Sequence, residues 1–217
     1  MSFVLEAESG EARDCVLSVE RSLTGKRWEW RCRNERAALG LAQRLGLPEP
    51  VARALAARGI DETAADRFLS PSLREQLPDP SSLKGMDAAA RRLAQAVRRG
   101  EEVAIFGDYD VDGATSAALL YRFFRAVGLT VRIYVPDRLK EGYGPNSSAL
   151  LALKRQGVQL VVTVDCGITA YEPLETAAAA GLEVIVVDHH AAEARLPPAV
   201  AVVNPNRLDD DSGLGQL

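Results

Sequence analysis

The sequence predicts an α/β protein in which a parallel β-sheet carries helices on both faces, preceded by a small, mainly helical module. From residue 103 onward, short runs rich in Val and Ile alternate with segments of helical periodicity. Each short run is almost continuously apolar, which is typical of strands buried on both faces of a parallel sheet. Before residue 78 the apolar residues recur mainly at helical spacing, which favours a separate helical module.

The predicted N-terminal module, residues 1–77, begins with two short strands and continues as short helices. The strands are expected over residues 15–19 and 28–31, around a turn at Thr24-Gly25. Helical periodicity then covers three segments, each bounded by glycine, proline or a capping residue: residues 38–45, 50–57 and 64–69.

The second predicted strand contains two tryptophans, Trp28 and Trp30, next to Arg27, Arg31 and Arg33. Aromatic and basic residues interleaved in this way occur in base-stacking patches for nucleic acid. The same pattern occurs more often in an edge strand whose arginine stems lie along apolar neighbours. The sequence leaves both interpretations open.

Residues 78–85, P-D-P-S-S-L-K-G, have the composition of a linker, so we expect a second domain over residues 78–217. The linker leads into a helix over residues 86–99. Four arginines lie outside the apolar face of this helix, where they form either a solvated surface or an approach path for a polyanion: Arg91, Arg92, Arg98 and Arg99.

The second domain is expected to alternate strands with helices. The strands are predicted over residues 103–106, 131–135, 160–164 and 183–187. The intervening helices are predicted over residues 114–127, 147–156 and 171–180, and a glycine follows each of them.

Composition and charge limit the class of protein. The chain has 217 residues, of which 47% are hydrophobic and 26% charged, as in ordinary globular proteins. It lacks an apolar run of membrane-spanning length and a secretory signal. Three cysteines, Cys15, Cys32 and Cys166, without C-x-x-C spacing argue against disulfides and structural zinc. We therefore expect a cytoplasmic protein without membrane association.

The net charge of −4 is unevenly distributed. Residues 1–100 carry 17 basic and 14 acidic side chains, whereas residues 101–217 carry 9 and 16. A net-negative protein binds nucleic acid poorly by charge alone. Cations bound to the acidic half would offset this deficit locally, so the charge balance does not exclude a phosphate-bearing substrate.

Polar side chains follow each predicted strand of the second domain. The first strand is followed by Asp108, Asp110 and Asp112, the second by Arg138, the third by Asp165, and the fourth by Asp188, His189 and His190. The carboxyl ends of parallel strands share one edge of a sheet, which is where ligands bind in such folds. An isolated D-x-D-x-D segment is often only a solvated acidic turn, but its combination with the other three strand ends favours a functional site.

The residue types at this edge predict a site for two divalent cations. Two ions about 3.5–4 Å apart need a bridging carboxylate, for which Asp165 is suited, and flanking ligands such as Asp110 and Asp112. Arg138 could clamp phosphate oxygens, and Gly142 and Gly144 would let backbone N–H groups approach a phosphate. Cys166 is a weaker candidate nucleophile, because no base lies near it in the sequence.

Four motifs occur in the order G-D-Y-D-V-D-G, P-D-R-x-x-E-G-Y-G, D-C-G and D-H-H. In this order they resemble those of the DHH phosphoesterase superfamily. L-P-D-P before them and V-N-P-N-R after them are similar to its RecJ branch, the single-strand-specific 5′→3′ DNA exonucleases of repair and recombination. The resemblance covers roughly residues 50–217.

The resemblance implies a site with assigned roles. Two Mn²⁺ or Mg²⁺ ions would be held by Asp110, Asp112, Asp165 and His189, with Asp108 either close by or also a ligand. His190 would contact the scissile phosphate or assist the leaving group, and Asp188 would support the cluster. The substrate phosphate would lie against Arg138, Gly142, Tyr143 and Gly144. Single-stranded DNA is the implied substrate, and a single-strand-binding protein and a repair helicase are the implied partners.

The sequence departs from this family at its end. Members continue with a further metal-binding aspartate, a long helix and a second domain, whereas this chain stops at S-G-L-G-Q-L. We therefore expect an N-terminal portion of such an enzyme, with weak or no activity of its own. Two alternatives are a phosphoesterase of the same superfamily acting on short oligonucleotides, cyclic dinucleotides or pyrophosphate, and a non-catalytic scaffold.

Overall fold

The computed structural model describes residues 15–31 and 34–215, and the chain divides into two compact units between Leu77 and Pro78. We call these the N-terminal unit and the C-terminal unit. None of the helices in the described ranges has the length and apolar character needed to cross a membrane.

The N-terminal unit is mainly helical, as predicted. Its elements are the 3₁₀ turn η1 (Val16–Ser18) and the helices α1 (Glu35–Leu45), α2 (Glu49–Ala56), α3 (Glu62–Leu69) and α4 (Leu73–Gln76). Helix α1 begins at Asn34, whose side chain accepts a hydrogen bond from the N–H of Ala37, and α3 begins at Asp61 in the same way. A small apolar core joins the first three helices: Leu41, Ala52, Leu55 and Ala65.

The two strands predicted over residues 15–19 and 28–31 are wrong, because no strand forms over residues 15–31. Leu17 and Ser18 adopt positive φ angles of 54° and 56°, which bend the chain into η1 and prevent a continuous ladder. Only Trp28 pairs with this bend, through hydrogen bonds to Val16 and Val19. The predicted turn is present, since the N–H of Gly25 donates to the carbonyl of Ser22.

The described part of the C-terminal unit contains a five-stranded parallel sheet in the order β2-β1-β3-β4-β5. Its strands are β1 (Val103–Gly107), β2 (Val131–Tyr134), β3 (Leu160–Val164), β4 (Glu183–Val187) and β5 (Ala201–Val203). Four of them match the predicted strands within one residue. The fifth was missed because its three residues are too short for a periodicity argument.

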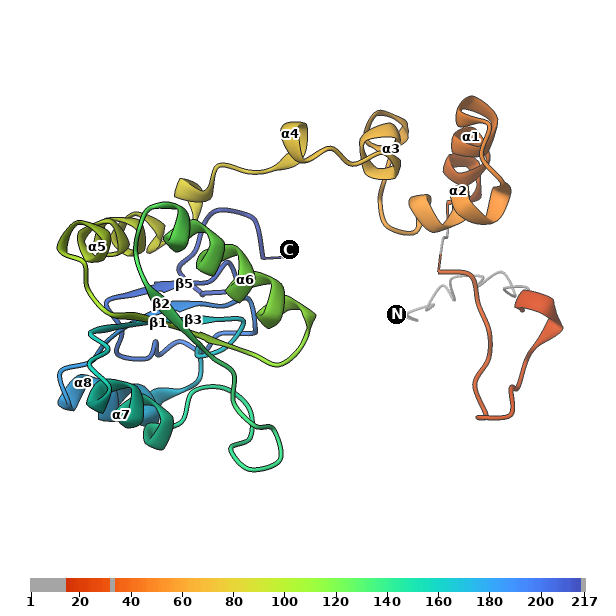
Figure 1. Ribbon diagram of the computed structural model, residues 1–217. Coiled ribbons are helices and arrows are strands. Elements are labelled where there is room, and N and C mark those ends of the chain that lie inside the picture. The colour runs from red at the N-terminus through yellow and green to blue at the C-terminus, as the bar shows by residue number, and fades with distance from the viewer. Residues whose placement is uncertain (1–14, 32–33, 216–217) are drawn as a thin grey trace, which may run out of the picture. The chain divides into compact units, whose positions relative to one another are not determined.

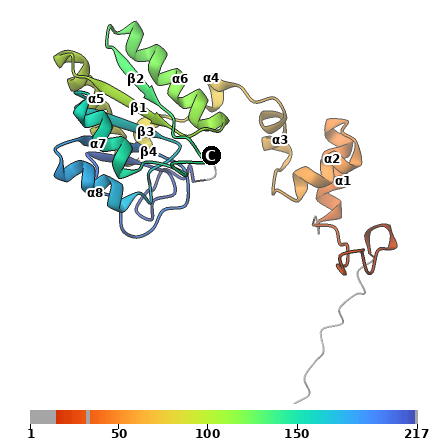
Figure 2. The ribbon, with the colours of Figure 1, turned by 60° about the horizontal axis from the view of Figure 1, so that its bottom comes forward.

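Helices cover both faces of this sheet, as the near-continuous apolar strands predict (Figure 1). Helices α5 (Met86–Arg99) and α6 (Val111–Ala126) pack on one face, and α7 (Ser147–Arg155) and α8 (Tyr171–Ala179) on the other. The turned view brings the layer of α7 and α8 forward (Figure 2). Strand β1 contributes to both cores, because Val103 and Ile105 face α5 and α6 whereas Ala104 and Phe106 face α7 and α8.

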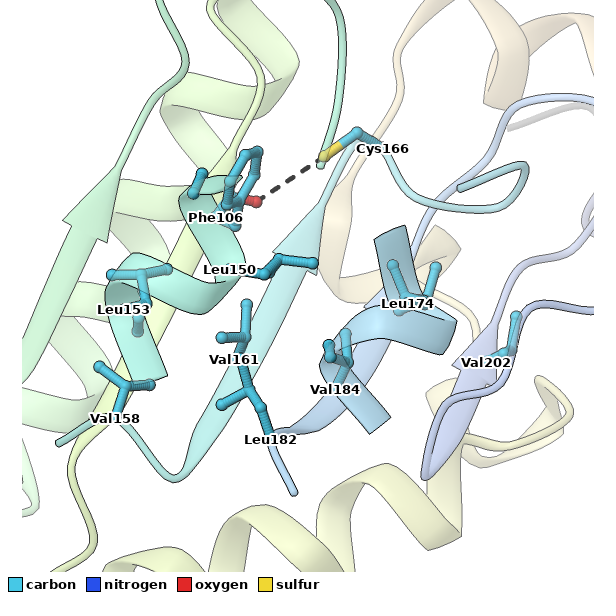
Figure 3. Close-up of a cluster of buried hydrophobic side chains, with 14 of the residues drawn as sticks. Phe106, Leu150, Leu153, Val158, Val161, Cys166, Leu174, Leu182, Val184 and Val202 are labelled. Carbon is cyan, nitrogen blue, oxygen red and sulfur yellow. Dashed lines mark hydrogen bonds between the residues drawn. The ribbon is translucent and has the colours of Figure 1, made fainter. Parts of the chain in front are cut away.

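The core beneath α7 and α8 is shown in Figure 3, where Leu150, Leu174 and Val161 interleave between helices and sheet. Cys166 belongs to this core: its Sγ donates weakly to the carbonyl oxygens of Phe106 and Val164. Burial raises the pKa of its thiol far above the usual range. A buried, protonated thiol is inert, which agrees with the expectation that Cys166 is a weak candidate nucleophile.

The segment predicted as a linker, residues 78–85, packs on the C-terminal unit instead of standing free. It contains the 3₁₀ turn η2 (Pro80–Ser82), and the N–H of Lys84 donates to a carboxylate oxygen of Asp210 at 2.9 Å. Gly85 lies against β5 so closely that a Cβ there would be 2.5 Å from the carbonyl oxygen of Val202. The composition of this segment therefore predicted its turns correctly, but the segment is not a free linker.

Arg92 does not belong to a solvated arginine surface, which corrects one of the two interpretations of helix α5. Its guanidinium is only 9% exposed and lies 2.6 Å from carboxylate oxygens of both Glu101 and Glu183. Glu101 is buried as well, with 6% of its side chain exposed. The ion pair between Arg92 and Glu183, the first residue of β4, thus links α5 to the sheet. Of the four arginines, Arg91, Arg98 and Arg99 are exposed.

Arg92→Ala is expected to lower the free energy of unfolding by about 3 kcal/mol, because it removes the buried guanidinium 2.6 Å from the carboxylate of Glu101 and leaves only the exposed Arg99, at 3.6 Å, as its counter-charge. Denaturant unfolding followed by circular dichroism measures this. The matched control is Arg91→Ala, whose ion pair with Asp87 is exposed at both ends, so its effect should stay within about 0.5 kcal/mol. Equal losses in the two variants would contradict the structural role of Arg92.

Candidate metal centre

The candidate centre lies at the carboxyl edge of the sheet, at the point where the strand order reverses. From β1 the chain passes to β2 on one side, and it then returns to place β3 on the other side of β1. The loops that follow β1 and β3 therefore diverge and leave a crevice between them. Asp108 directly follows β1 and Asp165 directly follows β3, so both carboxylates are delivered to this crevice.

The first loop is shaped by the start of helix α6. Asp110 caps the helix: its carboxylate accepts hydrogen bonds from the N–H groups of Asp112 and Gly113, each at 3.0 Å. The helix therefore begins at Val111, three residues before the predicted start, and Asp112 lies in its first turn instead of in the loop. Gly113 is packed on the backbone of Asp108, since an added Cβ would be 2.5 Å from its N and O atoms.

Asp165 occupies the centre of the site in an uncommon backbone conformation, with φ of 61°. The side chain is 4% exposed, and its Oδ1 lies 3.0 Å from Nε2 of His189. Its Oδ2 is buried, and so is Oδ1 of Asp108; among the described residues neither atom has a hydrogen-bond partner. Buried carboxylate oxygens without partners are costly, so they indicate that a ligand of positive charge completes the site.

Two groups of donor atoms at this site are close enough to hold cations. Oxygens of Asp108, Asp110 and Asp165 lie within 4.8 Å of one another, and so do donor atoms of Asp165, His189 and His190. Asp165 belongs to both groups, as a bridging ligand must. Carboxylate oxygens with imidazole nitrogens suit Mn²⁺ or a later metal better than Mg²⁺. The donor set thus fits two divalent cations.

Asp112 lies outside both groups of donor atoms. It lines a cavity of about 400 Å³ beside the carboxylates, together with Asp165, Asp188 and His189 and with apolar residues that include Met86. The structure therefore does not test the prediction that Asp112 is a metal ligand, because Asp110 belongs to a group of donor atoms and Asp112 does not.

The pKa values of Asp165 and Asp110 are shifted in opposite directions. Burial, followed by the neighbouring Asp110, raises the pKa of Asp165 to about 6. The pKa of Asp110 is lowered, chiefly by the N–H of Gly113 and then by Asp165. Asp165 is therefore the group at which a proton competes with a cation.

Cation binding is expected to weaken as the pH falls through about 6. Above this pH the carboxylate of Asp165 is free to bind metal, and below it each pH unit costs about tenfold in affinity, because a proton must first be displaced. Titration of Mn²⁺ into the chain at about pH 7.5, 6.5 and 5.5, followed by electron paramagnetic resonance of free Mn²⁺, measures this. A constant affinity over this range would contradict the assignment of Asp165.

Asp188 orients the two histidines. Its side chain is fully buried and accepts hydrogen bonds from the backbone N–H groups of Ile168, His189 and His190, between 2.7 and 3.1 Å. It also lies 2.7 Å from Nδ1 of His190. This contact selects the tautomer in which Nδ1–H donates to Asp188 and Nε2 keeps its lone pair, and it raises the pKa of His190.

Tyr143 lies against the same imidazole. Its hydroxyl donates to the backbone carbonyl of Asp165 at 3.1 Å and lies 3.2 Å from Nδ1 of His190, and the two rings meet edge to face. Tyr143 thus contacts both central residues, although the sequence assigned it only to a phosphate site. Burial raises its pKa well above the usual range, so the hydroxyl stays protonated.

The remaining phosphate-site candidates lie in the loop after β2. Gly142 and Gly144 adopt positive φ angles of 81° and 75°, as their turn requires. The guanidinium of Arg138 lies 4.7 Å from the ring centroid of Tyr109, the residue between Asp108 and Asp110 in the sequence. Glu141 closes the loop by accepting hydrogen bonds from Tyr134, Asn146 and the N–H of Asp137.

Two residues that hold the histidines were missed by sequence reasoning. Asn204 is fully buried, and its amide donates to the carbonyl of His190 at 3.0 Å. The amide of Asn206 donates to the carbonyl of His189, and its backbone N–H donates to Asn204. Both belong to the segment V-N-P-N-R, which the sequence analysis used only for the family resemblance. The two asparagines directly after a short apolar run were the signal that could have placed them at the same edge of the sheet.

Comparison with known proteins places these residues in a family. The sequence profile described as DHH family, N-terminal domain, matches residues 102–217. The chain is 37% identical over 181 residues to the single-stranded-DNA-specific exonuclease RecJ of Bacillus subtilis, a match that covers 83% of this chain but 23% of that protein. The chain therefore spans about a quarter of the length of this curated relative.

Two crystal structures share the fold. One is RecJ of Thermus thermophilus in complex with Mn²⁺, with a TM-score of 0.61 and 30% identity over 83% of this chain and 26% of that one. The other is exonuclease RecJ bound to manganese, with a TM-score of 0.55 and 38% identity over 61% of this chain and 36% of that one. With the profile match spanning more than half of its length, the chain belongs to the DHH family.

Proposed function

We propose that this chain forms the metal-binding part of a cytoplasmic exonuclease that hydrolyses single-stranded DNA in the 5′→3′ direction during DNA repair and recombination. The observation that carries the proposal is the pair of donor groups that share Asp165, with buried carboxylate oxygens that have no partner among the described residues. The similarity to RecJ exonucleases, some of them crystallised with Mn²⁺, supports the substrate and the metal.

In this proposal Asp108, Asp110, Asp165 and His189 hold two Mn²⁺ or Mg²⁺ ions, and Asp112 contributes from the first turn of α6. When bound, such ions neutralise phosphate charge and supply an activated water at neutral pH. The residues contribute rigidity, because Asp110 is fixed by its cap bonds and Asp165 is fixed by burial between β3 and His189.

His190 acts on the scissile phosphate or its leaving group. Asp188 holds Nδ1–H, so Nε2 is the atom that faces the reaction and can accept or return a proton. Tyr143 keeps the ring edge-on, while Asn204 fixes the backbone carbonyl of the same residue. Asp188 thus works through His190 as a positioning residue.

Arg138 and the Gly142–Gly144 turn bind the substrate phosphate. The guanidinium of Arg138 stacks on the ring of Tyr109, which limits its rotation and leaves its N–H groups to clamp phosphate oxygens. The two glycines leave their backbone N–H groups uncovered by a Cβ. Partners such as a single-strand-binding protein and a repair helicase are proposed by family resemblance alone.

The test is a degradation assay with single-stranded DNA labelled at its 3′ end, run with Mn²⁺, with Mg²⁺ and with chelator, beside RecJ of Bacillus subtilis as a positive control. Metal-dependent release of mononucleotides from the 5′ end supports the proposal. Consumption of dinucleotides or pyrophosphate with intact long strands would replace it by the small-substrate alternative. Absence of Mn²⁺ binding would contradict the metal centre and favour a scaffold.

A further inference from the structure

We propose that the N-terminal unit carries a binding platform for single-stranded DNA, on which unpaired bases stack against Trp28 and Trp30. This platform uses none of the residues of the metal centre and none of the four family motifs. It shares only the substrate class with the proposed function, so each of the two proposals can fail without the other.

Both indole rings of this segment are accessible. Arg27 and Glu29 form an ion pair at 3.3 Å, which places these two alternate side chains on one side of the backbone. Trp28 is 47% exposed and Trp30 is 52% exposed, so large parts of both rings are accessible.

The ring of Trp30 is held in place from behind. The guanidinium of Arg53 lies 5.1 Å from the ring centroid, in the range of a cation–π contact. Arg53 is itself fixed by Glu49 at 2.8 Å and Glu35 at 3.3 Å, and its side chain is 15% exposed. An indole supported on one face is preorganised to accept a flat group on the other, which reduces the entropy lost on binding.

The surrounding charges suit a polyanion. Within the described part of the chain, Arg21, Lys26 and Arg31 are exposed and have no ion-pair partner. Flat aromatic rings among free cations match a strand of bases linked by phosphates. Duplex DNA fits poorly, because its base faces are already covered by neighbouring base pairs.

The structure also removes the competing interpretation of this segment. An edge strand would bury its tryptophans against a sheet and extend its arginines along them, but no strand forms over residues 15–31 and the rings stay half exposed. Arg33, which was counted in the predicted patch, lies outside the described residues. The platform rests on the other cations.

Trp28 and Trp30 are the only tryptophans in the sequence, so tryptophan fluorescence, excited at wavelengths that tyrosine does not absorb, reports on this platform alone. The chain is titrated with single-stranded oligo-dT in the presence of chelator, which prevents metal-dependent cleavage. Stacking predicts quenching by the single strand and little change with duplex DNA or heparin. Equal quenching by heparin would reduce the contact to general charge attraction and overturn the proposal.

Alanine variants test each ring separately. Trp30→Ala and Trp28→Ala are each expected to weaken binding of labelled oligo-dT, measured by anisotropy, by about fivefold or more. In each variant the remaining tryptophan still reports by fluorescence. The matched control is Phe68→Ala on α3, an aromatic residue of similar exposure at 50%, which should leave affinity unchanged.

Folding and catalysis serve as independent readouts. Far-UV circular dichroism verifies that α1 to α3 persist in every variant. Unchanged affinity in both correctly folded tryptophan variants would refute the platform, whatever the nuclease assay shows. Conversely, loss of oligo-dT binding in these variants would support it even if the chain cleaved no DNA.

Discussion

Asp165→Asn is expected to abolish binding of both cations and, under the proposed function, to reduce metal-dependent cleavage of single-stranded DNA by about 10³-fold or more. Asp165 belongs to both groups of donor atoms, so a neutral amide weakens both sites together. Asparagine is the informative replacement, because it tolerates the left-handed backbone at φ of 61° better than alanine does. Bound Mn²⁺ per chain, measured after gel filtration, gives the stoichiometry.

The control for this variant is Asp87→Ala, which removes an exposed carboxylate from α5 and should leave both ions bound. Retention of two ions by Asp165→Asn would show that Asp165 is not the bridge.

Without metal, the same substitution is expected to stabilise the folded chain. Because burial raises the pKa of Asp165 to about 6, its charge destabilises the folded chain above this pH, and the penalty is relieved as the pH falls.

In chelator at neutral pH, Asp165→Asn should therefore raise the free energy of unfolding, on the order of 2 kcal/mol. At about pH 4 the gain should vanish, because the carboxyl group of the parent chain is then protonated. A variant that binds no metal yet folds more stably would identify Asp165 as a residue kept for binding. Reduced stability at neutral pH would instead point to a structural role.

His190→Ala is expected to retain both cations and, under the proposed function, to lower cleavage of single-stranded DNA by about 10³-fold. Proton transfer by a positioned histidine commonly contributes 10²- to 10⁴-fold. Its Nδ1 is occupied by Asp188, which leaves Nε2 for the substrate. The measurement combines Mn²⁺ stoichiometry with single-turnover cleavage of a labelled single strand.

Tyr143→Phe is the matched control, because it removes only the hydroxyl beside Nδ1 and keeps the edge-to-face ring contact. Its turnover should fall by less than about tenfold. The donor atoms of His190 lie within reach of Asp165 and His189, so a competing role is open to test. Loss of one ion in His190→Ala would move His190 among the ligands.

The fold was largely predictable from sequence because the predicted strands are short, mainly apolar runs rich in Val and Ile, and a glycine follows each helix predicted between them. The convergence of Asp108, Asp165 and His189 was predictable for the same reason, since parallel strands end at one edge. Strand order was not predictable, because nothing in β1 specifies whether β2 or β3 lies at its left or right side. The register of Asp112 was also missed, since capping by Asp110 begins the helix earlier than apolar periodicity indicates.

Other errors arose where a residue's partner is distant in sequence. Arg92 resembles its exposed neighbours in the helix, and only the folded chain brings Glu183 to it across 91 positions. The hydrogen bonds from Asn204 and Asn206 to the histidines depend likewise on β5 reaching β4. The bend at Leu17 and Ser18 is a local backbone choice that side-chain patterns do not record.

The close packing of Gly113 has a consequence for how members of this family are recognised. A single methyl group at this position would collide with the peptide of Asp108 and push the first aspartate away from the third strand. Such a chain would retain every carboxylate and histidine and yet have a misaligned centre. A survey that judges competence by the ligands alone would count it as active, so the glycine belongs in the signature as much as the aspartates do.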